Sequence, residues 1–291
     1  MGCVNPRALG VAAALFYIFL WASAYVPSKL GVLYSSPLWF LVVRFAAAGT
    51  VALALALAAG AKLPRDLRSW AAVFALGVLT NAVYLGCTYE ALRHLASGIG
   101  AIVASTNPLV LALVAPWLLR EPLTVRKIAG LLLGFAGVLA IVWVRSGTGT
   151  AAPHDVGLAM LGVLGSVAGT IVYKKWCTGL DLRSVTALQL LAAGLVILPL
   201  APLLEGPPHA IWSWQLVVSF LYVVGVMSFG ASLLWFWLLT HGEASRVTAY
   251  YFLTPAFGLA LSALLLHEPV GVHDVGGLAA IALGITLVQR A

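Results

Sequence analysis

A stretch in the first half of the chain, from Ala96 to Pro122, has a counterpart 147 positions later. It contains the pair Asn107-Pro108 and ends at Glu121-Pro122, and the shift places these pairs on Thr254-Pro255 and Glu268-Pro269. The other residues that match at this offset are His94 and His241, Gly130 and Gly277, and Gly137 and Gly284. So many matches at one offset indicate an internal duplication that covers about half of the chain.

Hydrophobic residues make up 62% of the chain and charged residues only 9%. Because a soluble domain carries about 25% charged residues, the sequence predicts an integral membrane protein. We therefore do not interpret the net charge of +7 as a sign of nucleic-acid binding. The cysteines, Cys3, Cys87 and Cys177, lie far apart without metal-ligand spacing, so we expect no metal site, disulfide framework or cofactor.

A spanning helix needs roughly 20 apolar residues, and ten segments of the chain are candidates. They are Ala8–Val26, Pro37–Ala59, Trp70–Glu90, Ala96–Leu118, Arg126–Val144, Val156–Trp176, Ser184–Leu204, Trp212–Leu239, Ala244–Leu266 and Val272–Val288. The first segment also resembles a signal peptide, with Arg7 before it and Ala22-Ser23-Ala24 as a cleavage site. Cleavage would remove the symmetry between the halves, so we favour an all-α integral membrane protein with ten transmembrane helices.

Lys and Arg concentrate on the cytoplasmic side of membrane proteins. With ten helices, both termini share a side that holds twelve Lys and Arg, against three on the other side, which predicts cytoplasmic termini. Five helices are an odd number, so the second half crosses the bilayer in the opposite direction to the first. The sequence therefore predicts two inverted five-helix repeats, residues 1–146 and 147–291, a construction that recurs in secondary transporters.

The proline in the fourth and ninth helices and the Glu-Pro at the end of each resemble the drug/metabolite transporter superfamily, specifically its EamA-type exporters. Phe16–Lys29 (FYIFLWASAYVPSK) and Val43-Arg44-Phe45 are similar to that family's first helix and to the arginine near the start of its second. The resemblance covers essentially the whole chain. The length and aromatic content of the chain are most similar to those of bacterial aromatic amino-acid exporters.

This resemblance implies a transporter of the bacterial inner membrane that exports amino acids and related small metabolites by alternating access. Aromatic or other bulky neutral amino acids are the expected substrates, and the family implies a central cavity lined by helices of both halves. Related exporters of nucleosides, sugars or cationic drugs share the same motifs, so these substrates stay open as alternatives.

Each proline within a helix removes a backbone N–H and frees the carbonyl four residues earlier. In hydrocarbon, such a break is expected to face protein or a wet cavity. We therefore expect Pro108 and Pro255 to mark helix breaks at the substrate site, with Ser105, Asn107 and Thr254 as its polar groups. The alternative is that the two breaks only shape helix packing.

Aromatic residues form the second set of candidates. Tyr17, Trp21 and Tyr25 repeat every four residues along one face of the first helix. The predicted cavity is lined by Trp21, Tyr84, Trp237, Tyr250 and Tyr251. Core packing is the alternative for each of them, but together they would suit a bulky, moderately apolar substrate.

Ionisable residues within the bilayer are costly and few. His94 and His241 occupy the duplicated position at the ends of the third and eighth helices. They are either gate residues or histidines whose hydrogen bonds are satisfied at loop ends. Arg44 lies some seven residues into the second helix, so we expect its side chain to snorkel outward. Glu90 is expected to pair with Arg93.

Other functional classes lack their signatures. An intramembrane enzyme would need an HExxH or GxGD motif, paired carboxylates or a Cys/His pair, and a channel would need rings of charge or carbonyls; the sequence contains none of the enzyme motifs and no such ring. Small residues indicate close helix packing at Gly130 and Gly134 of the fifth helix and at Gly276, Ala280 and Gly284 of the tenth. We expect these helices to pack within one chain, as a monomer rather than a homodimer. The expected partners are a small-molecule substrate and the lipid bilayer.

Overall fold

The structure is a computed structural model that describes residues 6–91, 93–95, 103–145, 152–257 and 271–291. Within these ranges the chain is almost entirely helical, and the extended backbone forms one isolated bridge between Ser35 and Ala210. The first residues of the duplicated stretch, Ala96–Gly98, and the second Glu-Pro pair, Glu268-Pro269, lie outside the described residues.

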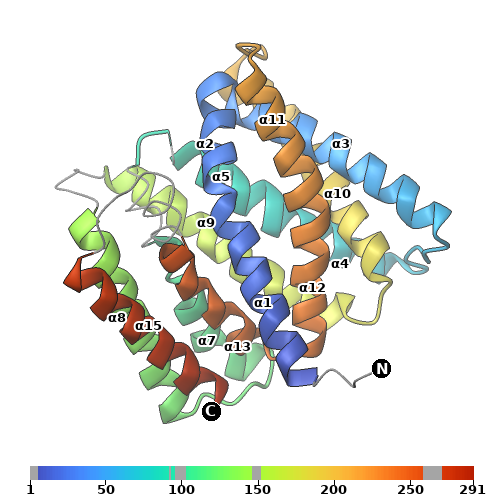
Figure 1. The fold of residues 1–291 in the computed structure, drawn as a ribbon. Helices are drawn as coiled ribbons and strands as arrows, with labels where there is room; N and C mark the ends of the chain where they lie inside the picture. The colour runs from blue at the N-terminus through green and yellow to red at the C-terminus, as the bar shows by residue number, and fades with distance from the viewer. Residues whose placement is uncertain (1–5, 92, 96–102, 146–151, 258–270) are drawn as a thin grey trace, which may run out of the picture.

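The helices follow the apolar segments of the sequence (Figure 1). The first half contains α1 (Pro6–Ser23), α2 (Tyr25–Tyr34), α3 (Pro37–Ala58), α4 (Leu67–Gly77), the π-helical η1 (Val78–Val83), α5 (Tyr84–Ala91), α7 (Asn107–Leu118) and α8 (Val125–Arg145). The second contains α9 (Pro153–Val172), the π-helical η2 (Tyr173–Cys177), α10 (Leu182–Glu205), α11 (Trp214–Tyr222), the π-helical η3 (Val223–Ala231), α12 (Ser232–His241), α13 (Ala244–Ala249), the 3₁₀-helical η4 (Tyr250–Leu253) and α15 (Val272–Gln289).

Five helices are long and apolar enough to cross a membrane: Pro37–Ala58, Leu67–Ala91, Pro153–Cys177, Leu182–Glu205 and Trp214–His241. Leu9–Ser23, Asn107–Leu118 and Asp274–Gln289 are shorter apolar helices within the described part of the chain. Membrane-spanning helices of this kind make the chain a multi-pass membrane protein.

The first helix differs from its predicted range, Ala8–Val26. It is interrupted at Ala24 and then continues as α2 to Tyr34. Pro27 explains the break, because it has no N–H to donate to the carbonyl of Ser23. In the last turn of α1 the Ser23 hydroxyl donates to the carbonyl of Leu20 at 2.7 Å.

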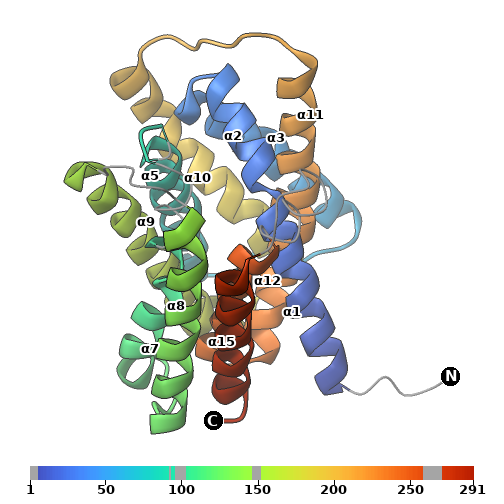
Figure 2. The ribbon, with the colours of Figure 1, turned by 60° about the vertical axis from the view of Figure 1, so that its left-hand side comes forward.

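Helices of the two halves pack against each other in pairs. α3 lies along α10, and α8 lies along α15. α1 contacts α12 while α2 contacts α11, and α5 contacts α9. The start of α1 and the end of α15 lie at one end of the bundle, opposite the loop between α10 and α11 (Figure 2).

The contact between α8 and α15 depends on glycines. A Cβ atom on Gly130 would lie 2.6 Å from the carbonyl oxygen of Gly284, and one on Gly284 would lie 2.5 Å from that of Gly130. Gly137 and Gly277 meet in the same way, at 2.6 Å and 2.9 Å. Gly277 and not Gly276 is therefore at the interface, since Gly276 has nothing within 4 Å.

A buried carboxylate joins the halves near the end of α7. Glu121, which is 7% exposed, accepts hydrogen bonds from the backbone N–H groups of Ala244 and Ser245 at 2.6 and 3.0 Å. These are the first residues of α13, so Glu121 satisfies N–H groups that a helix start leaves without partners. Lys127, which is 2% exposed, donates from Nζ to Glu243 at 3.0 Å and holds the same turn.

A second link joins the loop after α3 to the loop before α10. Asp181 accepts from the backbone N–H of Lys62 at 3.2 Å and pairs with Arg183 at 3.0 Å. The hydrogen bond from the Arg183 side chain holds the pKa of the Asp181 carboxyl below its ordinary value. Arg183 also donates to the carbonyl of Ala59 at 2.9 Å, so this pair fastens the loop after α3 to the start of α10.

The glycine contacts predict the effect of a side chain at this interface. Gly130→Val should destabilise the protein by about 1–3 kcal/mol, the usual cost of overpacking, because the new Cβ meets backbone that cannot move aside. Thermal unfolding in detergent measures this loss. Gly276→Val makes the same change at an exposed position and is expected to leave the transition temperature nearly unchanged. Equal losses in the two variants would contradict the packing described.

Candidate functional site

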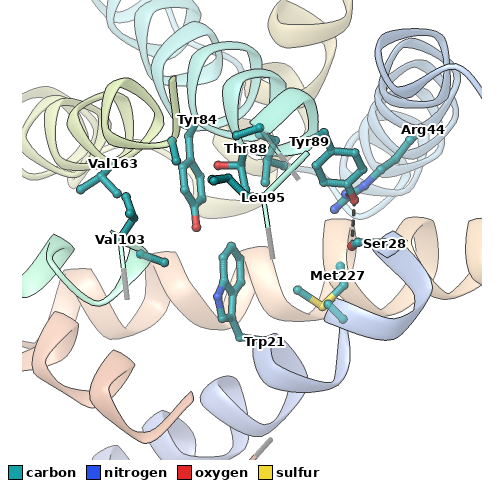
Figure 3. A pocket seen from close by; sticks show the side chains of 15 residues that line it. Trp21, Ser28, Arg44, Tyr84, Thr88, Tyr89, Leu95, Val103, Val163 and Met227 are labelled. Atoms are coloured by element: carbon teal, nitrogen blue, oxygen red, sulfur yellow. Dashed lines mark hydrogen bonds between the residues drawn. The ribbon is translucent and has the colours of Figure 1, made fainter. Parts of the chain in front are cut away.

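Three adjoining cavities occupy the centre of the bundle, and Trp21 and Tyr84 line all of them. We refer to them together as the central cavity. Figure 3 shows the Trp21 ring facing Tyr84, with Val103 and Val163 on one side and Arg44, Tyr89 and Ser28 on the other. Helices of both halves therefore contribute to its walls.

Five aromatic side chains form a continuous cluster in the walls. They are Tyr17, Trp21, Tyr84, Trp235 and Tyr251. The Trp21 and Tyr84 rings stack with centroids 6.1 Å apart, and Tyr251 meets Trp21 edge to face at 5.7 Å. The hydroxyls of Tyr17 and Tyr251 are hydrogen-bonded at 2.8 Å, which connects the first and last quarters of the chain. Such a cluster offers stacking faces to a planar or apolar ligand.

Both proline pairs interrupt regular helix beside this cavity. Residues 105–106 form a turn before α7, which begins at Asn107 with Pro108 in its first turn. In the other half α13 tightens into the 3₁₀ segment η4 immediately before Thr254-Pro255. Ser105, Asn107, Thr254 and Pro255 all line the same part of the central cavity. The two duplicated breaks therefore meet at one place.

Each break presents a buried oxygen without a hydrogen-bond partner among the described residues. These atoms are Oδ1 of Asn107 and Oγ1 of Thr254, whose residues are 6% and 9% exposed. The amide nitrogen of Asn107 donates to Ser166 at 3.0 Å, which fixes the orientation of the group. A buried polar atom without a partner costs roughly 1–3 kcal/mol. The two oxygens, at duplicated positions, are therefore suited to accept hydrogen bonds from a ligand's N–H or O–H groups.

Arg44 lies in the opposite wall of the cavity and does not snorkel outward as expected. It is 6% exposed and donates from Nε to Ser228 and from Nη1 to Tyr89, both at 3.2 Å. Tyr89 in turn donates to Ser28 at 2.8 Å. These hydroxyls draw the guanidinium inward, between α2, α5 and the π-helical η3.

A second polar group consists of uncharged side chains. The amide of Asn81 donates to the amide oxygen of Gln189, and the Thr80 hydroxyl lies 3.3 Å from the same oxygen. Together with Ser166 these residues line the cavity beside Tyr17 and Trp235. A sequence search restricted to ionisable residues passes over such amides, although amides in long apolar segments are also costly to bury.

Several predicted residues are placed elsewhere. Trp237 does not line the described cavities and packs on His241 with ring centroids 4.6 Å apart, while its neighbour Trp235 lines the cavity. Tyr250 is buried in the core and does not line these cavities, whereas Tyr251 does. The side chain of Tyr25 lies outside the described part.

The two duplicated histidines lie at exposed helix ends. His94 Nδ1 is 3.4 Å from Asp155, and His241 Nδ1 is 2.9 Å from the carbonyl oxygen of Trp237. Neither lines the cavities described here. The predicted pair of Glu90 and Arg93 forms at 3.0 Å. Among the described residues no group of three or more His, Cys, Asp or Glu could hold a metal ion.

Comparison with known protein families gives a match over nearly the whole chain. The profile of the EamA-like transporter family matches residues 8–143 and, separately, residues 156–290.

Individual relatives cover nearly their full lengths. "Uncharacterized transporter YvbV" of Bacillus subtilis is 29% identical over 286 residues, which cover 98% of this chain and 92% of that protein. "Protein PecM" of Dickeya dadantii is 25% identical, with 93% and 89% covered. A crystal structure with 19% sequence identity superposes with a TM-score of 0.80 over 97% of both chains, which shows that the fold is shared.

The unpaired hydroxyl of Thr254 predicts a gain in stability when it is removed. Thr254→Val keeps the shape of the side chain and should raise the free energy of unfolding by about 1 kcal/mol, because a buried polar atom without a partner is lost. Thr248→Val is the matched control, since the Thr248 hydroxyl donates to the carbonyl of Ala244 at 2.9 Å and its loss should destabilise. Thermal unfolding in detergent compares the two, and a similar loss in both would show that the Thr254 hydroxyl has a partner.

Proposed function

Since this chain belongs to the EamA-like transporter family, we propose that it exports amino acids and related small metabolites as a secondary transporter by alternating access. Aromatic or other bulky neutral amino acids are the substrates that the cavity suits best. That the chain is a multi-pass membrane transporter follows from the family match, from its relatives named transporters and from its spanning helices.

The observation that carries the proposal is the meeting of the two duplicated helix breaks in one aromatic cavity. Asn107 and Thr254 supply acceptor oxygens from opposite halves, and Trp21, Tyr84 and Tyr251 supply ring faces beside them. A ligand held between the halves is in contact with both, so a movement of one half against the other changes which end of the site is open. This is the geometry that alternating access requires.

We further propose that the chain consists of two inverted five-helix repeats, residues 1–146 and 147–291, with ten crossings. The two separate matches of the family profile support this division. So do the reciprocal contacts of Gly130 with Gly284 and of Gly137 with Gly277, because a shift of 147 residues converts one contact into the other. The α8–α15 interface is filled within one chain, which favours a monomer.

The proposed location is the bacterial cell membrane, with both termini in the cytoplasm. The excess of Lys and Arg on the side of the termini supports this orientation.

Transport by purified protein tests the proposal. In counterflow with proteoliposomes, labelled phenylalanine or tryptophan should accumulate, and Trp21→Ala should reduce the initial rate at least tenfold because a stacking face is lost. Trp237→Phe should transport at close to the unsubstituted rate, since Trp237 packs on His241 away from the cavity. If no amino acid, nucleoside, sugar or cationic drug is moved, the transporter proposal fails.

Labelling of single cysteines tests the orientation. In a chain whose Cys3, Cys87 and Cys177 are replaced by Ser, cysteines at the exposed positions Lys62 and Arg126 should react only after the membrane is permeabilised. A cysteine at His209, in the exposed loop at the other end, should react in intact cells. Lys127 is unsuitable as a reporter because it is buried. The reverse pattern would overturn the assignment of the termini.

A further inference from the structure

We propose that Arg44 is the substrate's anion-binding residue, and that the transported compounds therefore carry a carboxylate or an equivalent anionic group. This inference rests on the proposed transport function and narrows its substrate class. It excludes neutral sugars and nucleosides and purely cationic drugs, which the family resemblance alone leaves open.

The buried charge of Arg44 is costly. Arginine stays protonated in proteins, so Arg44 places a full positive charge in an environment where only 6% of the residue is exposed. Burying an isolated charge is costly unless an opposite charge or strong hydrogen bonds compensate it. A charge at membrane depth is therefore a functional candidate whose partner has to be named.

The described carboxylates are all engaged elsewhere. The chain has nine Asp and Glu residues, and only Glu268 lies outside the described part. The other eight are Asp66, Glu90, Glu121, Asp155, Asp181, Glu205, Glu243 and Asp274, each bonded to groups other than Arg44. The hydrogen-bond partners of Arg44, Ser228 and Tyr89, are neutral hydroxyls, and its guanidinium carbon lies 5.5 Å from the centroid of the Phe45 ring. No described carboxylate therefore neutralises the positive charge.

The geometry of the guanidinium also suits a bound anion. Its bonds to Ser228 and Tyr89 use Nε and Nη1, and no hydrogen bond to another described residue uses Nη2. Arg44 lines the cavity together with Trp21 and Tyr84, so an anion that reaches it has its organic part beside those rings. A planar guanidinium with free N–H groups is well matched to a carboxylate.

The other half of the chain contains a neutral counterpart of Arg44. A shift of 145 residues places Pro37, the first residue of α3, on Leu182, the first of α10, and it places Arg44 on Gln189. A shift of 147 places Asn81 on Ser228. The bond from Arg44 to Ser228 is thus the counterpart of the bond between Gln189 and Asn81.

In one half, a neutral glutamine makes the bridge from this helix to the neighbouring π-helical segment. The bridge therefore does not require a charge, and the arginine supplies something beyond packing. This comparison also gives the most informative substitution, because Arg44→Gln installs the residue that serves the same structural purpose in the other half.

The test compares ligands that differ in a single group. Competition against labelled phenylalanine in counterflow is measured for phenylalanine, 3-phenylpropionate, phenylalaninamide and phenethylamine. The unsubstituted protein should be inhibited by the first two and at least tenfold more weakly by the amide and the amine, which lack the carboxylate. Arg44→Gln should lose this discrimination and bind phenylalanine at least tenfold more weakly, while Arg44→Lys should retain part of both.

Calorimetric titration of the detergent-solubilised full chain with 3-phenylpropionate separates binding from transport. If the unsubstituted protein binds 3-phenylpropionate but transports no compound, and Arg44→Gln does not bind it, the transporter proposal is refuted and the role of Arg44 is supported. Phenylalanine transport by Arg44→Gln at the unsubstituted rate, or equal competition by the amide, would refute the role of Arg44 and leave the transporter proposal intact.

Thermal unfolding checks that the variant is folded, and Arg183→Gln controls for the loss of a positive charge at a loop far from the cavity. Arg44→Gln with an unchanged transition temperature and weakened binding supports the inference. If Arg44→Gln unfolds, the ligand series on the unsubstituted protein decides: competition by phenylalaninamide and phenethylamine as strong as by phenylalanine would refute the inference.

Discussion

A membrane interior offers polar groups no solvent, so every departure from regular helix in this chain needs a partner within the protein. Several of these departures lie at the centre of the structure. The two proline breaks, the π-helical segments η1 and η3, the amides of Asn81 and Gln189 and the charge of Arg44 all lie around or beside one cavity. The exterior is left to Leu, Val, Phe and Trp, which are exposed over much of the surface. The position of the cavity thus follows from where polar groups can be satisfied.

Much of the fold was predictable from the sequence because apolar length is a strong signal. The predicted segments Pro37–Ala59 and Ser184–Leu204 coincide with α3 and α10 within two residues. The faces of helices were less predictable. The π-helical η3 precedes α12. In a π turn the backbone hydrogen bond spans five residues instead of four, so the side chains of the following helix α12 are rotated about its axis. Trp237 is the residue predicted to line the cavity, whereas Trp235 lines it. The prediction that the Arg44 side chain snorkels outward was wrong for another reason. The hydroxyls that hold it inside the bundle come from helices distant in sequence.

The two halves share a framework and differ in chemistry at the centre. Val78–Val83 shifted by 147 residues falls on residues 225–230, inside η3, so the π-helical irregularity is itself duplicated. Each π-helical segment contacts the other half of the chain. At η1 this contact is the amide pair of Asn81 and Gln189, and at η3 it is Arg44 with Ser228. The backbone is similar in the two halves, but these few side chains differ. The pseudo-symmetric cavity therefore has one charged wall and one uncharged wall. With Arg44 as the proposed anion-binding residue, a ligand with a polar end and an anionic end would be held in one orientation.

The glycine seam between α8 and α15 has a consequence for how such a chain arose. Gly130 faces Gly284 and Gly137 faces Gly277, and each contact is the image of the other under the repeat. A surface with this property is complementary to its own copy, as in a twofold-symmetric dimer. Two separate five-helix chains inserted in opposite directions would join through the same seam. Fusion of the duplicated genes would then have preserved an existing contact, and it would have freed each half to change its cavity residues independently.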